Sequence, residues 1–419
     1  MNEHIFTGRV AILGLGYIGL PTAAALATRG VEVVGVDVNA ATVAAVSRGE
    51  VPFVEPDLAA AVSGAVAMGR LTASSEVPHA DAYIVAVPTP FNDDHSADLR
   101  YVRSAVESIA PHLRGGEVVI LESTSPPGTT EGVSRWLAEL RPDLVLPHSS
   151  EGVPDVYVAH CPERVLPGKI MIEMVTNDRV VGGVTPRCAQ QAAAVYRVFS
   201  QGEIVESDAA SAEMAKLVEN AYRDVNIAFA NELSLISEDL ELDVWEVIRL
   251  ANHHPRVNVL TPGPGVGGHC IAVDPWFIVG AAPERSRLIR TAREVNDLKP
   301  HHVAEQVAAK SERFRNPTIA CLGLAYKANI DDLRESPAVE IVAAIAELLP
   351  QTDVRVAEPM VHELPAELAA YPNVKLDGAA DAIAASDIVV LLVDHDHFKA
   401  LSRSRLAGKV VYDTRGFWR

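Results

Sequence analysis

The chain is poor in cysteine and has no long apolar run. Four cysteines occur in 419 residues, far apart and without a CxxC pair, which matches neither a zinc site nor a dense disulfide framework. No stretch approaches the roughly 18 consecutive apolar residues of a membrane span. The N-terminal stretch MNEHIFTGRV also lacks the basic, apolar and small-residue regions of a secretory signal. We therefore expect a soluble cytoplasmic protein with reduced thiols.

Positive charge is scarce as well. Lysine and arginine total 36 against 55 acidic residues, a net charge of −19. Nucleic-acid affinity depends on cationic side chains that release counterions from phosphates, so this balance argues against a nucleic-acid partner. An anionic small molecule remains compatible with it, because helix N-termini and local arginines create positive pockets in acidic proteins.

Several motifs of other enzyme classes are absent. There is no GxSxG, Walker A or EF-hand motif, and the histidines at 253–254, 269, 301–302, 395 and 397 form no HExxH or Cys/His spacing. Adjacent histidines usually point apart, so we expect no metal.

The order of apolar patterns predicts an α/β protein of two or three domains. The early strand-like runs are RVAILGLG, VEVVGVD, AYIVAVPTP and EVVILEST, with helical patterns between them. AEMAKLVENAYRDVNIAFANELSLISEDLEL then has long helical periodicity without proline or glycine. The late runs TIACLGLAY, DVRVAEP, DIVVLLVD and KVVYDTRG return to strands.

These patterns predict three domains. We expect an N-terminal Rossmann domain over residues 1–206, a central helical connector and dimerisation domain over 207–314, and a C-terminal Rossmann-like domain over 315–419. VAILGLGYIG and IACLGLAYKA form a faint internal echo. Because Ala325 stands where the first copy has Gly16, the second turn need not hold a pyrophosphate.

The segment Gly14-Leu15-Gly16-Tyr17-Ile18-Gly19 follows a strand and opens a helix, as the dinucleotide-binding GxGxxG pattern requires. Gly14 permits the tight turn, Gly16 lets the backbone approach a pyrophosphate, and Gly19 lets the helix pack on the sheet. Asp37 ends the next strand, where a carboxylate binds the ribose of NAD and repels the 2′-phosphate of NADP. The alternatives are a ligand-free turn and a helix-capping role for Asp37.

Polar residues come after two further strands. Thr89 and Ser123-Thr124 lie where the carboxyl ends of strands open onto a cofactor crevice. Simple turn or cap roles are the alternative.

Cys270 ends the glycine-rich stretch 262–270, PGPGVGGHC, and precedes Asp274-Pro275. The glycines let the backbone come close to a ligand, so a nucleophilic thiol is the functional interpretation. The alternative is a small buried hydrophobe, which we expect for Cys161, Cys188 and Cys321.

Lys216, Asn220 and Arg223 fall at i, i+4 and i+7 of the predicted middle helix. This spacing puts them on one face. Such a face meets either a substrate or only solvent.

Several motifs together resemble the UDP-glucose/UDP-mannose dehydrogenase family, and the match extends over nearly the whole chain. Within the family, ANHHPRVN followed by GVGGHCIAVDPWFIV is most similar to the bacterial UDP-N-acetyl-D-mannosamine dehydrogenases. The motifs are GLGYIGLP, AVPTPF, ILESTSPPGTTE, CPERVLPG, NDRVVGG, AEMAKLVENAYRDVNIAFANELSLI, ANHHPRVN, PGPGVGGHCIAVDPWFIV and GLAYKANIDDLRESPA.

The resemblance implies an NAD-dependent four-electron oxidation at C6 of a UDP-N-acetylhexosamine, for surface polysaccharide synthesis. It implies that Cys270 forms a thiohemiacetal and then a thioester. By the same resemblance Lys216 serves as general acid/base or stabilises the alkoxide and oxyanion, helped by Asn220 and an ordered water. By the same similarity Glu163, Asp274 and Thr124 activate and hold the hydrolytic water. The resemblance also implies an active site between domains, UDP bound by the C-terminal domain, and a homodimer or higher homo-oligomer.

Further contacts are carried over position by position from the family motifs. Arg334 is expected to reach the cofactor, possibly that of a partner subunit, and Pro127 departs from the small apolar residue expected in the loop before Thr130. The cofactor positions are Gly14, Gly16, Tyr17, Ile18, Gly19, Asp37, Thr89, Thr130 and Arg334, and the substrate positions are Arg164, Val165, Lys216, Asn220, Arg223, His254, Arg256, Gly267, Tyr326 and Lys327.

Other interpretations remain compatible with the sequence. A UDP-N-acetylglucosamine or UDP-glucose 6-dehydrogenase differs only in the sugar. A two-electron alcohol dehydrogenase of the 3-hydroxyacid class shares the domain pattern and a catalytic lysine but has no need of Cys270. A non-catalytic nucleotide-sensing protein would retain the fold but not turnover, and the presence of Cys270, Lys216 and Asn220 together argues against it.

Overall fold

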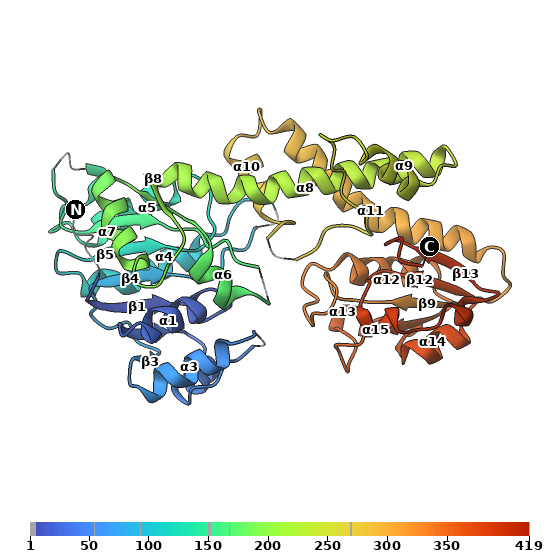
Figure 1. Ribbon diagram of the computed structural model, residues 1–419, viewed down its shortest axis with the longest axis horizontal. Coiled ribbons are helices and arrows are strands. Elements are labelled where there is room, and N and C mark those ends of the chain that lie inside the picture. The colour runs from blue at the N-terminus through green and yellow to red at the C-terminus, as the bar shows by residue number, and fades with distance from the viewer. Residues whose placement is uncertain are drawn as a thin grey trace. The chain divides into compact units, whose positions relative to one another are not determined.

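The structure is a computed structural model that describes residues 6–53, 55–92, 94–149, 152–166, 168–268 and 270–418. The chain forms two compact units, Met1–Val218 and Glu219–Arg419, and the boundary falls inside the long helix α8 (Ala209–Asp239). Each unit contains one sheet (Figure 1).

The sheet of the first unit has eight strands in the order β3-β2-β1-β4-β5-β6-β7-β8. Its first six positions reproduce the Rossmann order 3-2-1-4-5-6, in which the chain reverses direction across the sheet between β1 and β4. All neighbouring strands are parallel except β6 and β7. The strands are β1 (Arg9–Leu13), β2 (Glu32–Val36), β3 (Leu71–Ser74), β4 (Ala82–Val85), β5 (Val118–Leu121), β6 (Tyr157–His160), β7 (Arg179–Gly183) and β8 (Ile204–Asp208).

Helices cover both faces of this sheet. Alternate strand residues point to opposite faces, so Val10 and Ile12 pack with α1, α3, α6 and α7, whereas Ala11 and Leu13 pack with α4 and α5. The helices are α1 (Gly19–Thr28), α2 (Ala40–Ser47), α3 (Leu58–Ala67), α4 (Arg100–Ile109), α5 (Thr129–Leu140), α6 (Ile170–Thr176) and α7 (Pro186–Tyr196), with short 3₁₀ turns at Ala110–His112 and Pro147–Ser149.

The second unit contains helices and then a parallel five-stranded sheet in the order β11-β10-β9-β12-β13. Helices α11 and α12 cover one face, and α14 and α15 cover the other. The elements are α9 (Val244–Ala251), α10 (Asp274–Ala281), α11 (Arg287–Ser311), β9 (Thr318–Leu322), α12 (Pro337–Leu348), β10 (Asp353–Ala357), α13 (Ala366–Ala369), β11 (Val374–Leu376), α14 (Ala379–Ala385), β12 (Ile388–Leu391), α15 (Asp396–Lys399), a 3₁₀ turn at Arg403–Leu406 and β13 (Val410–Asp413).

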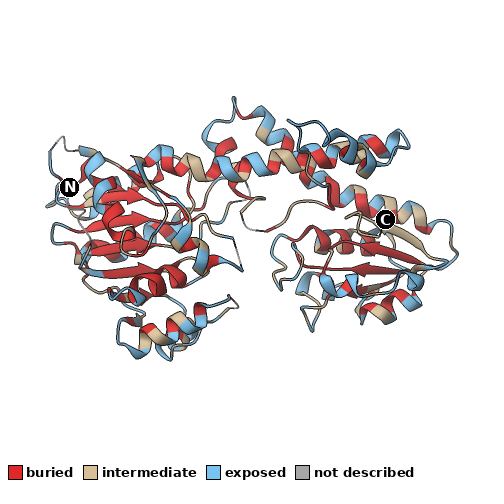
Figure 2. Cartoon of the chain, viewed as in Figure 1, coloured by how far each residue is buried: buried red, intermediate tan, exposed pale blue. Residues whose placement is uncertain are grey.

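The predicted fold class is confirmed: Rossmann and Rossmann-like sheets stand before and after a helical segment, and each predicted strand run contains a strand. The buried strands form the cores of both sheets (Figure 2). Strands β7 and β8 run opposite to the first six strands of this sheet.

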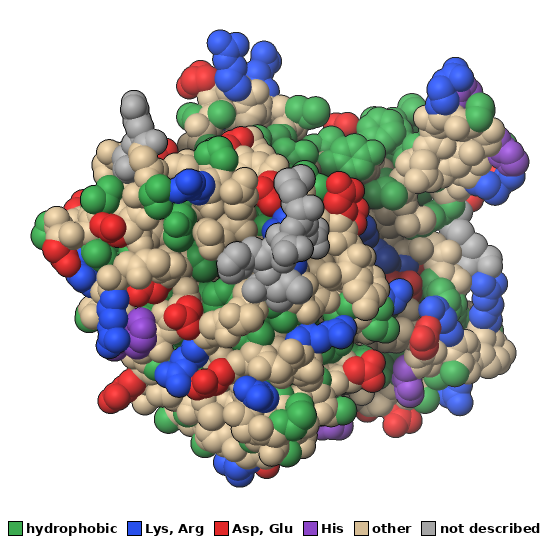
Figure 3. Space-filling view, turned by 60° about the vertical axis from the view of Figure 1, so that its left-hand side comes forward, with side chains coloured by type: hydrophobic (Ala, Val, Ile, Leu, Met, Phe, Trp, Pro, Cys, Tyr) green, Lys and Arg blue, Asp and Glu red, His purple; other side chains and the backbone are tan. Residues whose placement is uncertain are grey.

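No helix in the described ranges is long and apolar enough to cross a membrane. On the face shown in Figure 3, lysine and arginine side chains are interspersed with aspartate and glutamate.

Candidate active site

The turn between β1 and α1 has the geometry of a dinucleotide-binding loop. Gly14 has a φ of +97°, and a Cβ there would collide with the carbonyl oxygen of Ala86. A Cβ on Gly19 would collide with the Gly14 carbonyl oxygen. Gly16 differs, because nothing lies within 4 Å of the place where its Cβ would be. The first and third glycines are therefore required by the fold, and the second faces open space in which a pyrophosphate fits.

Asp37 connects the end of β2 to this turn. Its Oδ2 accepts a hydrogen bond from the Leu15 amide at 2.9 Å, and its Oδ1 accepts from the Asn39 amide at 2.8 Å. Helix α2 is capped instead by Asn39, whose side chain accepts from the Ala41 amide. A capping role for Asp37 is thus excluded, and its carboxylate retains lone pairs that can accept ribose hydroxyls. These residues fit NAD.

Tyr17 and Ile18 lie partly buried at the start of α1. The Tyr17 ring stacks on Phe53 with centroids 4.2 Å apart, which fixes one side of the turn.

The loops after β4 and β5 are joined to each other at the same sheet edge. The Thr89 hydroxyl donates to the Thr124 carbonyl oxygen at 2.6 Å, and the Ser123 hydroxyl donates to the Val87 carbonyl oxygen at 2.7 Å. Thr89 and Thr124 therefore follow strands on the β4 side of the point where the strand order reverses, between β1 and β4, which is where a Rossmann sheet has its cofactor crevice.

Thr130 is fully buried, and its hydroxyl bonds to a protein group. The hydroxyl donates to Glu213 Oε1 at 2.6 Å, and its amide donates to the same oxygen at 2.7 Å. The Gly128 amide donates to Glu213 Oε2 at 2.6 Å. Pro127 has no amide hydrogen to donate. The backbone hydrogen bonds to the Glu213 carboxylate come from Gly128 and Thr130.

Glu163, Arg164 and Val165 come after β6, and Glu163 forms a buried ion pair. Its Oε2 lies 3.3 Å from both terminal nitrogens of Arg179, whose guanidinium lies 5.0 Å from the Tyr196 ring centroid. Such a pair, with both partners removed from water, is held in one geometry by its surroundings.

A second buried carboxylate, Glu122, belongs to the same group. The Tyr196 hydroxyl donates to it at 3.2 Å, and so does the Thr22 hydroxyl. Burial, and then the negative charge of Glu163, raise the pKa of Glu122 to about 8. No motif assigned roles to Glu122, Arg179 or Glu213. The sequence signal that could have identified these three residues was a charged side chain inside a family motif or next to a buried strand.

Cys270 differs sharply in access from the other three cysteines. All four cysteines of the chain are described; Cys161, Cys188 and Cys321 are buried, whereas Cys270 is partly exposed. Burial raises the pKa of the Cys161 and Cys321 thiols to about 12, so these stay protonated and unreactive. The accessible thiol is therefore Cys270.

Cys270 lies immediately before α10, close to two other predicted residues. The Asp274 amide donates to the Cys270 carbonyl oxygen at 2.8 Å. The buried Asp274 carboxylate accepts a hydrogen bond from Asn220 Nδ2 at 2.5 Å. The fold thus brings Asn220, Cys270 and Asp274 together from two helices and the loop between them.

The glycine-rich loop packs closely on the C-terminal part of its unit. Gly268 has a φ of +83°, and a Cβ there would lie 2.9 Å from the Tyr326 ring. A Cβ on Gly267 would collide with the Glu335 carbonyl oxygen. A Cβ there would also lie 2.8 Å from the Tyr326 Cβ, so Gly267 and Tyr326 are neighbours. His269 of this loop lies outside the described residues.

The remaining predicted residues lie on three elements. Lys216 is partly buried on α8 and shares a helix face with Asn220 and the exposed Arg223. Lys327 is exposed beside Tyr326, and Arg334 is exposed with its guanidinium on Asp332. His254 and Arg256 are exposed after α9, where the Arg256 amide donates to His254 Nδ1.

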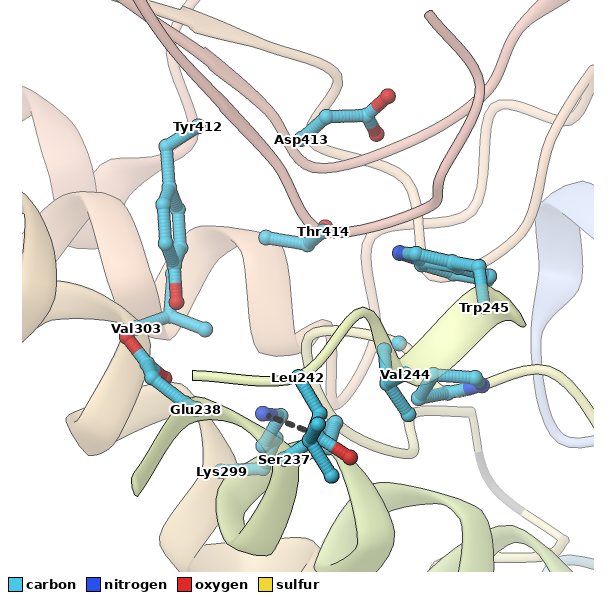
Figure 4. A pocket seen from close by; sticks show the side chains of 13 residues that line it. Ser237, Glu238, Leu242, Val244, Trp245, Lys299, Val303, Tyr412, Asp413 and Thr414 are labelled. Carbon is cyan, nitrogen blue, oxygen red and sulfur yellow. Dashed lines mark hydrogen bonds between the residues drawn. The ribbon is translucent and has the colours of Figure 1, made fainter. Parts of the chain in front are cut away.

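A cavity of about 240 Å³ lies in the second unit, beside Pro262 and Gly263 at the start of the cysteine loop. Lys299, Trp245 and Thr414 line it (Figure 4). The Lys299 ammonium is almost fully buried and donates to the Ser234 hydroxyl at 2.7 Å; burial lowers its pKa to about 8. Sequence motifs did not indicate this buried cation. Among the described residues, no three His, Cys, Asp or Glu side chains gather as metal ligands would.

The Rossmann order, the open second glycine and the acid after β2 together define an NAD-dependent dehydrogenase. Comparison with protein families then gives the particular family. The chain belongs to the UDP-glucose/GDP-mannose dehydrogenase family: residues 8–200 match its NAD binding domain, residues 210–298 its central domain and residues 320–419 its UDP binding domain. The family's second nucleotide sugar is GDP-mannose, where we had expected UDP-mannose.

Individual relatives agree over almost the full chain. An NDP-N-acetyl-D-galactosaminuronic acid dehydrogenase of Ralstonia nicotianae is 55% identical, over 98% of this chain and 96% of its own. A UDP-N-acetyl-D-mannosamine dehydrogenase of Escherichia coli K12 is 54% identical, over 98% and 99%. The solved structure of a UDP-D-ManNAc dehydrogenase from Pyrococcus horikoshii has a TM-score of 0.86 at 37% identity, over 98% and 96%.

Proposed function

We propose that this protein oxidises UDP-N-acetyl-D-mannosamine at C6 to UDP-N-acetyl-D-mannosaminuronate, using two NAD per sugar, as a precursor for surface polysaccharide. The main support is the setting of Cys270. It is the accessible thiol of the chain, and it lies one turn before an aspartate that is hydrogen-bonded to Asn220.

NAD, when bound, supplies the hydride acceptor for both oxidations. Gly14, Gly16 and Gly19 shape the turn for its pyrophosphate, and Asp37 accepts from its ribose. Further residues that match cofactor positions in the family are Tyr17, Ile18, Thr89, Thr130 and Arg334. Because the Thr130 side chain is bonded to Glu213, we expect Thr130 to act through the loop backbone.

In the first oxidation the sugar C6 hydroxyl loses a proton and C6 loses a hydride, which leaves an aldehyde. We expect Lys216 to accept this proton as general base or to stabilise the alkoxide that forms as the proton leaves. Asn220 donates one hydrogen of its amide nitrogen to Asp274, and we expect the second hydrogen of that NH₂ group to be donated to the reacting oxygen.

In the second oxidation the Cys270 thiolate adds to the aldehyde and gives a thiohemiacetal. Loss of the second hydride from C6 converts it into a thioester. Water attacks the thioester, which releases the carboxylate and restores the thiol. Glu163 is our proposed base for this water, with Thr124 and Asp274 holding it by hydrogen bonds. Covalent trapping retains the reactive aldehyde between the two oxidations.

The positions that match nucleotide-sugar contacts in the family are Arg164, Val165, Arg223, His254, Arg256, Gly267, Tyr326 and Lys327.

The identity of the sugar is inferred from relatives whose names indicate two different sugars. Those from E. coli and P. horikoshii are named for N-acetylmannosamine, and those from Ralstonia for N-acetylgalactosaminuronic acid. The galacto-configured sugar is therefore the second candidate.

A substrate panel tests the assignment. NADH formation is measured with UDP-ManNAc, UDP-GalNAc, UDP-GlcNAc and UDP-glucose at equal concentrations. We expect the highest kcat/KM with UDP-ManNAc and two NADH per sugar. A higher kcat/KM for any of the others rejects the N-acetylmannosamine assignment.

Replacement of the nucleophile tests the mechanism. Cys270→Ser should lower acid formation by on the order of 10³-fold or more, because serine is a far weaker nucleophile at neutral pH. Cys188→Ser is the matched control and should retain activity. Two NADH per sugar at an undiminished rate in Cys270→Ser would exclude the thioester.

We also infer that the chain forms homodimers through α8. Val218, Tyr222, Phe229 and Ile236 are between 47% and 71% exposed, and their spacing of four and seven residues places them on one helix face. An apolar stripe of this length is typical of a surface that another subunit covers.

A further inference from the structure

Glu213 lies at the junction of two segments of the proposed site. It is 1% exposed and occupies the second turn of α8, three residues before Lys216. Its carboxylate accepts three hydrogen bonds, from the Gly128 amide and from the amide and hydroxyl of Thr130. These donors belong to the first turn of α5 and to the loop that begins at Thr124.

The start of α8 is held from a second side. A Cβ on Gly182 of β7 would lie 2.6 Å from Ala212 Cβ, so the first turn of α8 rests directly on the strand backbone. The Asp208 carboxylate accepts the Ser211 amide at 2.8 Å and caps the same turn. With one side of the helix fixed on the sheet, a hydrogen-bonded carboxylate on Glu213 determines where the loop 124–130 lies relative to the helix.

The connection continues to the cofactor side of the sheet. Thr124 is joined through its carbonyl oxygen to Thr89, in the loop after β4, next to the reversal of strand order between β1 and β4. Residues three apart on a helix are neighbours on its surface, so Glu213 and Lys216 lie on adjacent parts of α8. A continuous series of contacts therefore leads from the crevice loops to the helix turn before Lys216.

We infer that Glu213 is a positioning residue, which fixes the cofactor-side loop 124–130 to α8 so that the loop and Lys216 keep one relative position. The inference rests on the proposed function for the role of Lys216. Burial raises the pKa of Glu213 to about 7, against the effect of its three donors. Asp208 raises it further, and Lys216 is the cation on the next turn. The protein thus tolerates an unfavourable buried acid at this position.

The test compares Glu213→Gln with Glu131→Gln, which removes an exposed carboxylate from the same first turn of α5. Glutamine has the same shape but presents an NH₂ group to one of the donors. We expect Glu213→Gln to weaken NAD binding, measured without sugar, at least about 5-fold, and to lower kcat at least about 10-fold, since small misplacements reduce rates strongly. The KM of Glu213→Gln for the nucleotide sugar should stay within about twofold of the wild-type value. For Glu131→Gln, the NAD affinity, kcat and KM should all stay within about twofold of the wild type.

Thr130→Val gives a graded second test that removes only the hydroxyl donor, should Glu213→Gln not fold. It should have a smaller effect in the same direction, and the double variant should be less impaired than the product of the single effects. Unchanged NAD affinity and kcat in a destabilised variant would show a purely structural role and reject the inference. If the wild type oxidises no sugar of the panel, the proposed function fails, while the NAD affinities still decide whether Glu213 positions the loop.

Discussion

Two buried ionisable residues, Glu122 and Arg179, determine the electrostatic environment of the proposed base, Glu163. Arg179 pairs with Glu163, and Glu122 reaches the same guanidinium neighbourhood through Tyr196. With a pKa near 8, Glu122 is mostly protonated at neutral pH. A protonated Glu122 does not compete with Glu163 for the charge of Arg179.

Replacing Glu122 by glutamine should remove a specific pH dependence of stability. The folded pKa, about 8, lies above the ordinary value of 4.5, so between these values the folded protein binds more protons than the unfolded chain. Its free energy of unfolding then falls as pH rises, with a slope approaching about 1.4 kcal/mol per pH unit from this group. Urea unfolding from about pH 5 to about pH 8.5 should show this slope in the wild type and a flatter curve in Glu122→Gln.

Glu139→Gln supplies the control, because Glu139 is largely exposed on α5. Its stability curve should match that of the wild type. Parallel curves for Glu122→Gln and the wild type would mean that Glu122 is ionised in the folded protein across this range.

At the scale of elements, the β1–α1 turn separates two kinds of glycine. Gly14→Ala introduces a Cβ at positive φ and against the Ala86 carbonyl, which costs about 1–3 kcal/mol or more. Gly16→Ala meets no protein atom within 4 Å. We expect Gly14→Ala to lower the thermal midpoint, and Gly16→Ala to keep it while weakening NAD binding at least about 10-fold.

Differential scanning fluorimetry and titration calorimetry measure the two effects separately. Full NAD affinity in Gly16→Ala would mean that the pyrophosphate does not approach this glycine.

The exposed stripe of α8 predicts the effect of a charge at its centre. Phe229→Glu places a carboxylate where a second copy would bury the side chain, so the dimer should dissociate, with at least about a 10-fold rise in its dissociation constant. Sedimentation velocity measures this directly. Met68→Glu, at an apolar residue with similar exposure outside the stripe, should leave the association state unchanged. A monomeric wild type would reject the interface.

The sequence predicted elements well where one physical signal dominated. Strands such as β1 and β5 are continuous apolar runs, and α8 has uninterrupted helical periodicity. Strand β8, IVESD, is polar and largely exposed at the sheet edge, so its pattern resembles a loop. The direction of β7 depends on how its connection folds back, which local periodicity does not encode.

The residues of the candidate site also form two groups, those that the sequence indicated and those that only the tertiary structure revealed. Cys270 and the glycines were visible because their sequence neighbours are unusual. The hydrogen bonds of Glu213 to residues 83 and 85 positions earlier, and of Asn220 to Asp274, join segments that only the tertiary fold brings together.

At the scale of the whole molecule, the two sheets repeat one turn. Gly14 and Gly323 have φ values of +97° and +96°, and their amides donate to the last residue of the neighbouring strand, Val36 and Ala357, at 2.8 Å in both cases. Glu358 then accepts from the Leu324 amide at 2.7 Å, as Asp37 accepts from Leu15. The echo seen in the sequence is therefore also present in hydrogen-bond geometry.

The two turns lead into different structure. Helix α1 begins at Gly19, directly after the first turn, whereas α12 begins only at Pro337. The second turn therefore lacks a helix N-terminus for a pyrophosphate. We expect calorimetry to give one NAD per chain.

Paired substitutions of the two acids test this difference. Asp37→Ala should weaken NAD binding at least about 10-fold, because the ribose loses its acceptor. Glu358→Gln should leave NAD affinity unchanged and lower stability by about 1–3 kcal/mol, through its buried hydrogen bonds. Two NAD per chain, or weaker NAD binding in Glu358→Gln, would contradict a single cofactor site.

His395 gives the repeated turn a further meaning. Its Nε2 lies 3.1 Å from Glu358 Oε2, and its Nδ1 accepts the Asn329 amide at 3.0 Å. In the first domain, Asp37 follows the second strand and can still accept a hydrogen bond from a bound ligand. In the second domain, the corresponding Glu358 is already bonded to His395 of the same domain. The second turn thus satisfies, with a side chain of its own domain, the hydrogen-bonding capacity that Asp37 retains for a ligand in the first.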